Sequence, residues 1–354
     1  MSIIIFDKKK VKTFSYLSFC IFLKHSDIAN FEIFRRNIFI FRWVFLRTRL
    51  EEWTVKALFI INPSSGRQNF FNMVEQLIGR LVMQQLVPHI DVFYTKKQND
   101  AKERAAQIVE NEYDFVTAVG GDGTLNEVIN GVILSKTKTP IAVISAGTVN
   151  DFANCLNLPQ GIDDFCEMIK TFKCKDVDVG KVNDRYFVNV LAGGLLTDVG
   201  YKVPKELKAI MGKMAYYVEG AKDLPKNLFR TVKVRFESEE YTKDVDAVVF
   251  IIANSRSVGG FKNMASLASV SDGLLDVIVL RKVEFPYITN FLIKILQGDH
   301  INHPSVDYFQ TKALKIEYIG DKEPVTVDYD GECLGELPVE IEVAPKAIQL
   351  LVRE

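Results

Sequence analysis

The sequence predicts an α/β domain followed by a β-rich domain, both placed after an N-terminal extension. Three observations lead to this fold class. Short apolar segments alternate with helix-length segments from residue 55 to 176, strand-like segments dominate residues 177–354, and residues 1–54 show neither pattern. The chain has 354 residues, which is enough for about two domains that each bury a core.

The first domain, residues 55–176, is expected to be a parallel sheet with helices on both faces. Its predicted strands are residues 57–61, 90–94, 115–119 and 141–144, and its predicted helices are 70–86, 101–111 and 125–134. Strands separated by helix-length segments are typical of βαβ units, whose ligands bind at the carboxyl ends of the strands. Polar loops fall at four of those ends, at residues 62–66, 95, 119–127 and 147–148.

The second domain, residues 177–354, is expected to be β-rich. Its predicted strands are residues 177–179, 186–190, 232–236, 247–252, 274–280, 314–318 and 325–329, interrupted by predicted helices at 205–222 and 287–297. Two last strands, 339–343 and 348–352, either close this domain or return to the first.

The N-terminal extension has a composition unlike that of the rest of the chain. Its first 50 residues contain nine Phe and eight Ile but no Gly or Pro, and their formal charge is +7 against −8 for the remainder. The longest uncharged stretch is 11 residues, too short for a membrane-spanning helix of about 20 residues. The extension is either a basic membrane-surface segment or the product of a start assigned too early on AT-rich DNA, and we favour the second interpretation.

Charge and cysteine usage exclude some classes of protein. A net charge of −1 argues against a general nucleic-acid binder, so no nucleic-acid partner is expected. The five cysteines form no C-x-x-C pair and no zinc spacing, which favours reduced thiols in a cytosolic protein; they are Cys20, Cys155, Cys166, Cys174 and Cys333.

The most informative motif is the glycine turn Val119 to Glu127, which follows the third predicted strand and opens into a helix. Its glycines let the backbone approach an anionic ligand closely, because they lack a Cβ. The free N–H groups at the start of the helix then point at that ligand. Asp122 within the turn would repel a bare phosphate, so the motif predicts a nucleotide bound together with a bridging Mg²⁺.

Two further loops have the chemistry of phosphate sites. Asn62-Pro63-Ser64-Ser65-Gly66 follows the first strand, and its hydroxyls and free backbone N–H groups suit phosphate oxygens. Ser145 to Ala153 follows the fourth strand and adds a glycine, a hydroxyl and an Asn-Asp pair that suits a helix cap. Each loop alone is typical of an ordinary βα connection, so the prediction depends on their convergence.

These three motifs, in this order and spacing, resemble the catalytic domain of the diacylglycerol kinase superfamily, and most closely that of soluble bacterial lipid kinases. The resemblance covers about residues 55 to 352, with further matches at residues 190–194, 215–217 and 328–332. The glycine turn alone is shared with NAD kinases and 6-phosphofructokinases. The resemblance implies a Rossmann-like, phosphofructokinase-like first domain and a sandwich-like second domain.

The same resemblance implies binding roles. ATP would be held by Asn62, Pro63, Ser64, Ser65, Gly66, Thr95, Gly121, Asp122, Gly123, Thr124, Leu125, Asn126, Glu127 and Thr148, with Asp122 organising the catalytic Mg²⁺. Ser269, Asp272 and Leu274 match a second, structural Mg²⁺ site, although close relatives often carry a longer polar residue in place of Ser269. The residues alone describe an ordinary turn there.

Asp330 and Glu332 are the candidate catalytic carboxylates, together with Asp122. Phosphoryl transfer to an alcohol needs in-line positioning, charge neutralisation and a carboxylate that accepts the hydroxyl proton. The resemblance implies that Glu332 is this base, with Asp330 supporting it or aligning the metal. The local sequence alone is typical of a hairpin turn.

The implied reaction is transfer of the γ-phosphoryl group of ATP to diacylglycerol, giving phosphatidic acid for phospholipid metabolism. The lipid substrate lies in a membrane, so a cytoplasmic protein is expected to contact the inner membrane face transiently. A basic face around Lys205, Lys208 and Lys213 is either this contact or an ordinary solvated surface. The resemblance to dimeric enzymes also suggests a homodimer.

Three alternatives stay open at this level. In the first alternative the acceptor is another lipid, such as phosphatidylglycerol, a sphingoid base or a polyprenol. In the second the protein is an NAD kinase that shares the glycine turn. In the third alternative it is a sensor that binds nucleotide without turnover.

Overall fold

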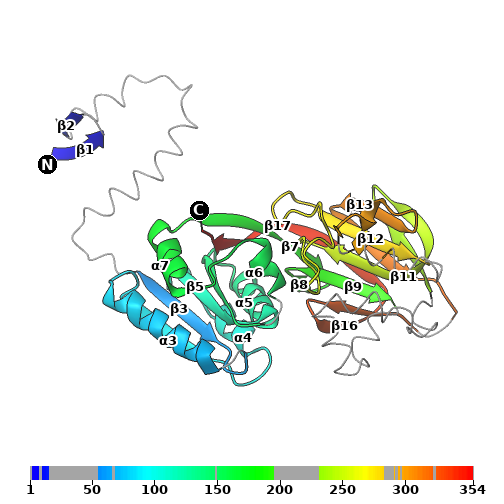
Figure 1. Ribbon diagram of the computed structural model, residues 1–354, viewed down its shortest axis with the longest axis horizontal. Helices are drawn as coiled ribbons and strands as arrows, with labels where there is room; N and C mark the ends of the chain where they lie inside the picture. Colours follow the sequence, from blue (N-terminus) through cyan, green and yellow to red (C-terminus); the bar gives the residue numbers. More distant parts are fainter. Residues whose placement is uncertain are drawn as a thin grey trace. The chain divides into compact units, whose positions relative to one another are not determined.

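A computed structural model describes residues 2–7, 10–15, 55–65, 68–147, 150–194, 231–282, 291, 294–295, 297–321 and 324–353. The chain divides into two compact units, Met1–Trp53 and Thr54–Glu354. In the first unit, β1 (Ser2–Asp7) pairs antiparallel with β2 (Lys10–Ser15), and the rest of the predicted extension lies outside the described residues. All further described elements belong to the second unit (Figure 1).

The second unit begins with the predicted parallel sheet. Neighbouring strands are parallel throughout, in the order β6 (Ile141–Ser145), β5 (Phe115–Gly120), β3 (Lys56–Ile61) and β4 (His89–Tyr94). Successive residues of β3 belong to different cores, with Leu58 and Ile60 in one and Phe59 and Ile61 in the other. Both faces of the sheet are therefore covered, which explains why every residue of β5 is buried.

Helices form the two outer layers of this sheet. Residues of α3 (Gln68–Met83) and α7 (Ile162–Thr171) pack in the core that contains Phe59. Residues of α4 (Asp100–Ala106), α5 (Asp122–Ser135) and α6 (Asp151–Cys155) pack in the core that contains Leu58. α6 begins at the Asn-Asp pair that was expected to cap a helix, although Asn150 makes no side-chain capping hydrogen bond. The prediction missed α7, extended α4 to residue 111, and began α5 at Leu125 instead of Asp122. The earlier start of α5 makes Asp122 part of its first turn.

The remainder of the unit is β-rich, as predicted, and its strands pair antiparallel. They are β7 (Cys174–Val182), β8 (Arg185–Phe187), β9 (Val190–Gly194), β10 (Val232–Glu237), β11 (Thr242–Ala253), β12 (Leu275–Arg281), β13 (Val306–Thr311), β14 (Ala313–Tyr318), β15 (Thr326–Tyr329) and β16 (Glu332–Glu336). Their shared core contains Phe236 and Phe250, whose rings meet edge to face at 5.7 Å. Strands β13 and β16 were not predicted.

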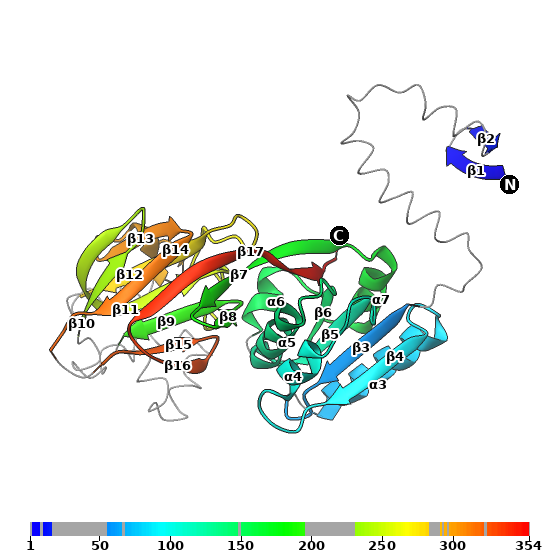
Figure 2. The same ribbon diagram turned by 180° about the vertical axis from the view of Figure 1, so that it is seen from behind.

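One strand joins the parallel and antiparallel parts of the sheet. β17 (Val339–Leu351) pairs antiparallel with β14 and β7, and its Leu350 lies parallel to Ile141 of β6 (Figure 2). The prediction of two strands, 339–343 and 348–352, is therefore wrong, because the chain passes between them through a register shift between Ala344 and Ile348. The expected domain boundary at residues 176–177 falls within β7, which pairs antiparallel with β17.

Some predicted elements fall where little is described. The helix expected at 205–222 lies outside the described residues, and so do Lys205, Lys208 and Lys213. Within 287–297 only Phe291, Lys294, Ile295 and Gln297 are described, all of them helical. Among the described helices, none is long and apolar enough to cross a membrane.

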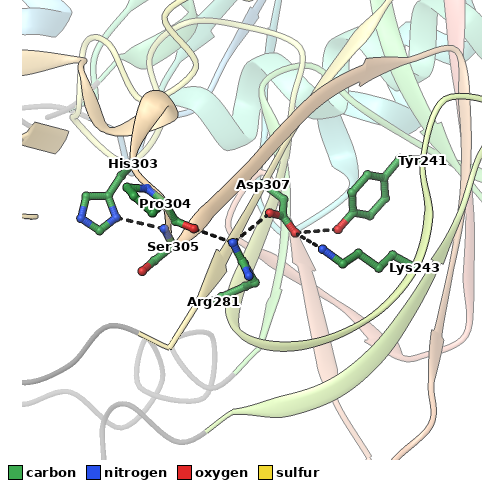
Figure 3. Close-up of polar contacts among 7 residues, drawn as sticks. All are labelled: Tyr241, Lys243, Arg281, His303, Pro304, Ser305 and Asp307. Atoms are coloured by element: carbon green, nitrogen blue, oxygen red, sulfur yellow. Dashed lines mark hydrogen bonds and ion pairs between the residues drawn. The ribbon is translucent and has the colours of Figure 1, made fainter.

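A polar cluster links β11, β12 and β13 of the β-rich part (Figure 3). Asp307 of β13 accepts a hydrogen bond of 2.7 Å from the Tyr241 hydroxyl and forms ion pairs with Lys243 and Arg281 at 3.4 and 3.3 Å. The Tyr241 ring stacks on Phe309 with centroids 4.3 Å apart. Because burial and the Asp307 carboxylate both favour the neutral phenol, the pKa of Tyr241 is raised. The cluster therefore fastens the start of β11 to β12 and β13.

Asp307→Ala should lower the free energy of unfolding by about 1–3 kcal/mol, because a mostly buried tyrosine hydroxyl loses its acceptor. Denaturant unfolding followed by circular dichroism measures this change. The exposed Asp321→Ala serves as the control and should stay within about 0.5 kcal/mol of the unsubstituted protein. Equal stability of the two variants would mean that the cluster is only a surface feature.

Candidate functional site

Three of the four predicted loops, at residues 62–66, 95 and 119–127, meet around one cavity of about 370 Å³ at the carboxyl ends of β3, β4 and β5. It is lined by Asn62, Ser64, Ser65, Thr95, Lys96, Lys97, Gln98, Ala101, Gly121, Gly123, Thr124, Glu127 and Glu332. Pro63, Asp122, Leu125 and Asn126 belong to the same loops and helix but are not among the lining residues. Gly66 and Thr148 lie outside the described residues.

The loop after β3 is fastened to the first turn of α5. The Asn62 side-chain amide donates to the Thr124 hydroxyl at 3.0 Å, and its oxygen accepts from the Ser64 N–H at 2.9 Å. Gly120 is required at the end of β5, since a Cβ there would lie 2.4 Å from the Thr124 hydroxyl. The two loops therefore present their hydroxyls and N–H groups as one surface.

Glu127 has a structural role in addition to lining the cavity. Its two carboxylate oxygens accept hydrogen bonds from the backbone N–H groups of Asn99 and Ala101, at 2.9 and 3.1 Å. These N–H groups lie at the start of α4, where they have no partner within the helix. Glu127 thus holds the loop that carries Gln98 against α5.

Asp122 is a carboxylate whose charged form is disfavoured by its surroundings. Burial, followed by the charges of Asp151 and Asp330, raises its pKa to about 6, although backbone hydrogen bonds from Asp151 and Asn150 oppose the shift. Among the described residues, no three acidic, histidine or cysteine side chains are close enough to hold one metal ion. Mg²⁺ typically binds one or two protein carboxylates and takes its other ligands from substrate phosphates and water. Asp122 at the head of α5 fits this pattern.

Asp330 is held by hydrogen bonds on both of its oxygens. One oxygen accepts from the Asn126 amide and the Val188 N–H, both at 2.7 Å, and the other accepts from the N–H groups of Asn189 and Val190 at 3.0 and 2.8 Å. Burial raises the pKa of Asp330, and these donors counteract it. Because both of its oxygens accept hydrogen bonds from the protein, Asp330 acts as an anchor for the turn and not as a metal ligand.

The anchor positions Glu332. Asp330 and Gly331 form a turn with φ of 44° and 87°, so β15 and β16 make a hairpin instead of one continuous strand. At the start of β16, the two oxygens of Glu332 accept hydrogen bonds from Gln98 at 3.3 Å and from the Tyr329 hydroxyl at 3.2 Å. Glu332 is half-buried and is the cavity-lining carboxylate contributed by the β-rich part.

Several residues of this arrangement were not anticipated. Asn130 donates to the Tyr186 carbonyl at 2.9 Å, a group that Asn126 also reaches at 3.0 Å. Gln98 and Tyr329 contact Glu332 directly. The signal in the sequence was indirect, since Asn126 and Asn130 are polar residues one helical turn apart among the apolar residues Leu125, Val128, Ile129 and Val132.

The three residues predicted for a second metal site lie together in the loop before β12. Asp272 is exposed and accepts from the Leu274 N–H at 3.1 Å, which is an ordinary turn contact, and Ser269 is partly buried. Asp178 holds this loop by accepting from the Gly273 N–H at 2.7 Å. Nearby, Asp276 is fully buried, and one of its oxygens has no partner among the described residues. Burial raises its pKa to about 6.

Comparisons with known proteins agree with this geometry. Residues 56–182 match the family model of the diacylglycerol kinase catalytic domain, and residues 194–352 match that of the YegS C-terminal NAD kinase beta sandwich-like domain. A diacylglycerol kinase of Staphylococcus epidermidis is 35% identical over 283 residues, which cover 80% of this chain and 87% of that protein. A diacylglycerol kinase of Staphylococcus aureus is 34% identical over 283 residues, covering 80% and 88%.

Solved structures show the same fold. A crystal structure of a diacylglycerol kinase from Bacillus anthracis str. Sterne superposes with a TM-score of 0.67 at 25% sequence identity. The superposition covers 86% of this chain and 99% of that one.

Asp330→Ala should lower the free energy of unfolding by about 2–4 kcal/mol, because three backbone N–H groups and an amide lose their acceptor. Glu332→Ala is the matched control, two residues away, and should cost less than about 1 kcal/mol. Urea unfolding of both variants measures the difference. Similar values for the two would show that Asp330 is not the anchor described here.

Asp122→Asn should change how stability depends on pH. An aspartate whose pKa is raised to about 6 in the folded state stabilises the protein when protonated, and this contribution is lost as pH rises from about 4 through 6. The variant should therefore exceed the unsubstituted protein in stability at pH 8 by about 1–3 kcal/mol, with no gain below pH 4. Thermal unfolding at pH 8 and below pH 4, with a metal chelator present, measures the stability difference between the two proteins. A gain that is independent of pH would contradict the assignment.

Proposed function

The chain belongs to the diacylglycerol kinase catalytic-domain family and is a kinase of that type; we propose that it phosphorylates the free hydroxyl of diacylglycerol, using ATP and Mg²⁺. One observation carries the proposal: Glu332 of the β-rich part closes the cavity formed by the phosphate-type loops of the α/β part. A carboxylate at this position would lie beside the acceptor hydroxyl, next to the γ-phosphate of bound ATP. The names of the relatives support diacylglycerol as the acceptor.

ATP would occupy the 370 Å³ cavity with its phosphates at the N-terminus of α5. The free N–H groups of that first turn and the Ser64 and Ser65 hydroxyls suit phosphate oxygens. Lys96 and Lys97 line the same cavity and add positive charge. When Mg²⁺ is bound, it neutralises phosphate charge, and Asp122 would hold it, which also accounts for the cost of burying this carboxylate.

Glu332 would act as the general base. It accepts the acceptor hydroxyl proton as the oxygen attacks the γ-phosphorus, while the bond to the ADP oxygen breaks. Gln98 and Tyr329 fix the orientation of the carboxylate through one hydrogen bond to each oxygen. Asp330 positions the turn that carries Glu332 and does not contact the substrate.

A structural cation at the loop before β12 is a second part of the proposal. Asp272 and backbone oxygens of Ser269 and Leu274 would hold it. The oxygen of buried Asp276 that has no partner among the described residues supports this placement. Oxygen donors of this kind suit Mg²⁺, and this chemistry supports the proposal.

The cellular setting is proposed from the substrate. Diacylglycerol resides in membranes, so a cytoplasmic protein would bind the inner membrane face transiently and return the product to phospholipid synthesis. A homodimer and the absence of nucleic-acid partners complete the proposal. Another lipid acceptor, NADP formation, or nucleotide binding without turnover are the alternative outcomes of the test below.

The full chain is incubated with γ-labelled ATP, Mg²⁺ and one acceptor. The acceptor is NAD, or mixed micelles of diacylglycerol, phosphatidylglycerol, a sphingoid base or undecaprenol. Labelled phosphatidic acid is expected. Glu332→Gln should lower kcat at least about 100-fold, because general-base catalysis typically contributes that much. Glu336→Gln, which alters an exposed carboxylate on the same strand, should change kcat less than twofold.

Other results would revise the proposal in definite ways. Label on a different lipid keeps the mechanism and changes the acceptor. Conversion of NAD to NADP without lipid labelling indicates an NAD kinase, and ATP binding without any product indicates a sensor. Full activity of Glu332→Gln would remove Glu332 as the base.

A further inference from the structure

Glu332 also lines a second cavity, of about 470 Å³. This cavity is lined by Gln98, Asn99, Lys102, Arg185, Tyr329, Gly331, Glu332 and Cys333. It shares only Gln98 and Glu332 with the cavity formed by the phosphate-type loops. A group that enters the second cavity therefore reaches Glu332, which also lines the proposed nucleotide cavity.

Two cations from different elements line the second cavity. Lys102 comes from α4 and Arg185 from β8, and within the described part of the chain neither forms an ion pair with a carboxylate. Arg185 is nevertheless held in place, because it donates to the Tyr329 hydroxyl at 3.4 Å and lies 5.5 Å from the centre of that ring. The Tyr329 hydroxyl in turn donates to Glu332 at 3.2 Å. One guanidinium is thus linked to the proposed base through a single phenol.

The charges in this cavity balance after the proposed transfer, not before it. Two cations face one carboxylate while the acceptor still carries a neutral hydroxyl. During transfer the hydroxyl proton moves to Glu332, the new O–P bond forms, and the P–O bond to ADP breaks. The product phosphomonoester then carries a charge of about −1.5 to −2 near neutral pH, and Glu332 is neutral. Lys102 and Arg185 match this final charge.

We propose that Lys102 and Arg185 form a subsite for the phosphomonoester of the phosphorylated lipid. The inference rests on the proposed function, since the subsite adjoins the proposed base and receives the group that the reaction creates. Arg185 supplies a planar set of donors for phosphate oxygens, and Lys102 supplies a mobile charge on the facing helix. Both interactions strengthen as negative charge moves from the nucleotide to the acceptor, which favours transfer over the unreacted complex.

The test measures binding without turnover. Dihexanoyl phosphatidate, dihexanoylglycerol, inorganic phosphate and ADP are titrated calorimetrically into the full chain and its variants. Lys102→Gln and Arg185→Gln should each weaken phosphatidate binding about tenfold, the effect of losing one charge-assisted hydrogen bond. Arg185→Lys, which keeps the charge, should recover part of the affinity. ADP affinity should be unchanged in all three variants.

Lys138→Gln, an exposed lysine before β6, is the matched control and should leave phosphatidate binding unaltered. Dihexanoylglycerol separates recognition of phosphate from recognition of the glycerol backbone, so its affinity should be insensitive to the cations. Inorganic phosphate should show the same sensitivity as phosphatidate, but with weaker binding.

Three results would overturn the inference. They are unchanged phosphatidate affinity in both neutral variants, an equal loss of ADP affinity, or an equal loss of dihexanoylglycerol affinity. The proposed function fails separately, through the absence of labelled phosphatidic acid in the turnover assay. A protein that binds phosphatidate through these cations but phosphorylates another lipid would retain the subsite and change the acceptor.

Discussion

The hydrogen bonds of Asp330 are the constraint on which the site depends. This carboxylate joins α5, the connection between β8 and β9, and the β15–β16 turn through Asn126 and three consecutive backbone N–H groups. Every one of those partners belongs to a different stretch of chain from Glu332. The position of the proposed base relative to the phosphate-type loops therefore follows from one buried network, and packing of the β-rich core alone would not define it. Such networks are costly when incomplete, which explains why each oxygen of Asp330 has two donors.

The same network explains how three carboxylates coexist near the head of α5. Asp330 is satisfied by four donors, and Asp151 accepts from the Ser257 hydroxyl and from the Gly260 N–H. Asp122 has weaker hydrogen-bond compensation, and burial together with the charges of Asp151 and Asp330 raises its pKa to about 6. The charged form of Asp122, in the first turn of α5, is thus disfavoured by its surroundings. A divalent cation would offset this effect at the point where the chemistry needs positive charge.

Local patterns were sufficient for the fold class and for the loops at the strand ends. The strands β3, β5 and β6 are short apolar runs, and glycine and proline mark the turns that follow them. The residues missed were those whose role depends on distant partners. Gln98 bonds to Glu332 across 234 positions, and Asn130 bonds to the Tyr186 carbonyl across 56. β16 escaped prediction because Gly335, with φ of 133°, interrupts the alternation of a five-residue strand. In α7 the signal was present, since Phe165, Cys166, Met168 and Ile169 share one buried face.

β17 has a consequence for the order in which the protein can be completed during synthesis. Its residues near Leu350 pair with β6, and its earlier residues pair with β14, so the parallel sheet receives its last neighbour from the end of the chain. A nascent chain that has already exposed β3 to β6 still presents an open edge at β6. That edge closes only after β17 leaves the ribosome, and until then it is open to pairing with other chains. The two halves of the enzyme therefore mature together, once β17 has been made, although one of them is encoded first.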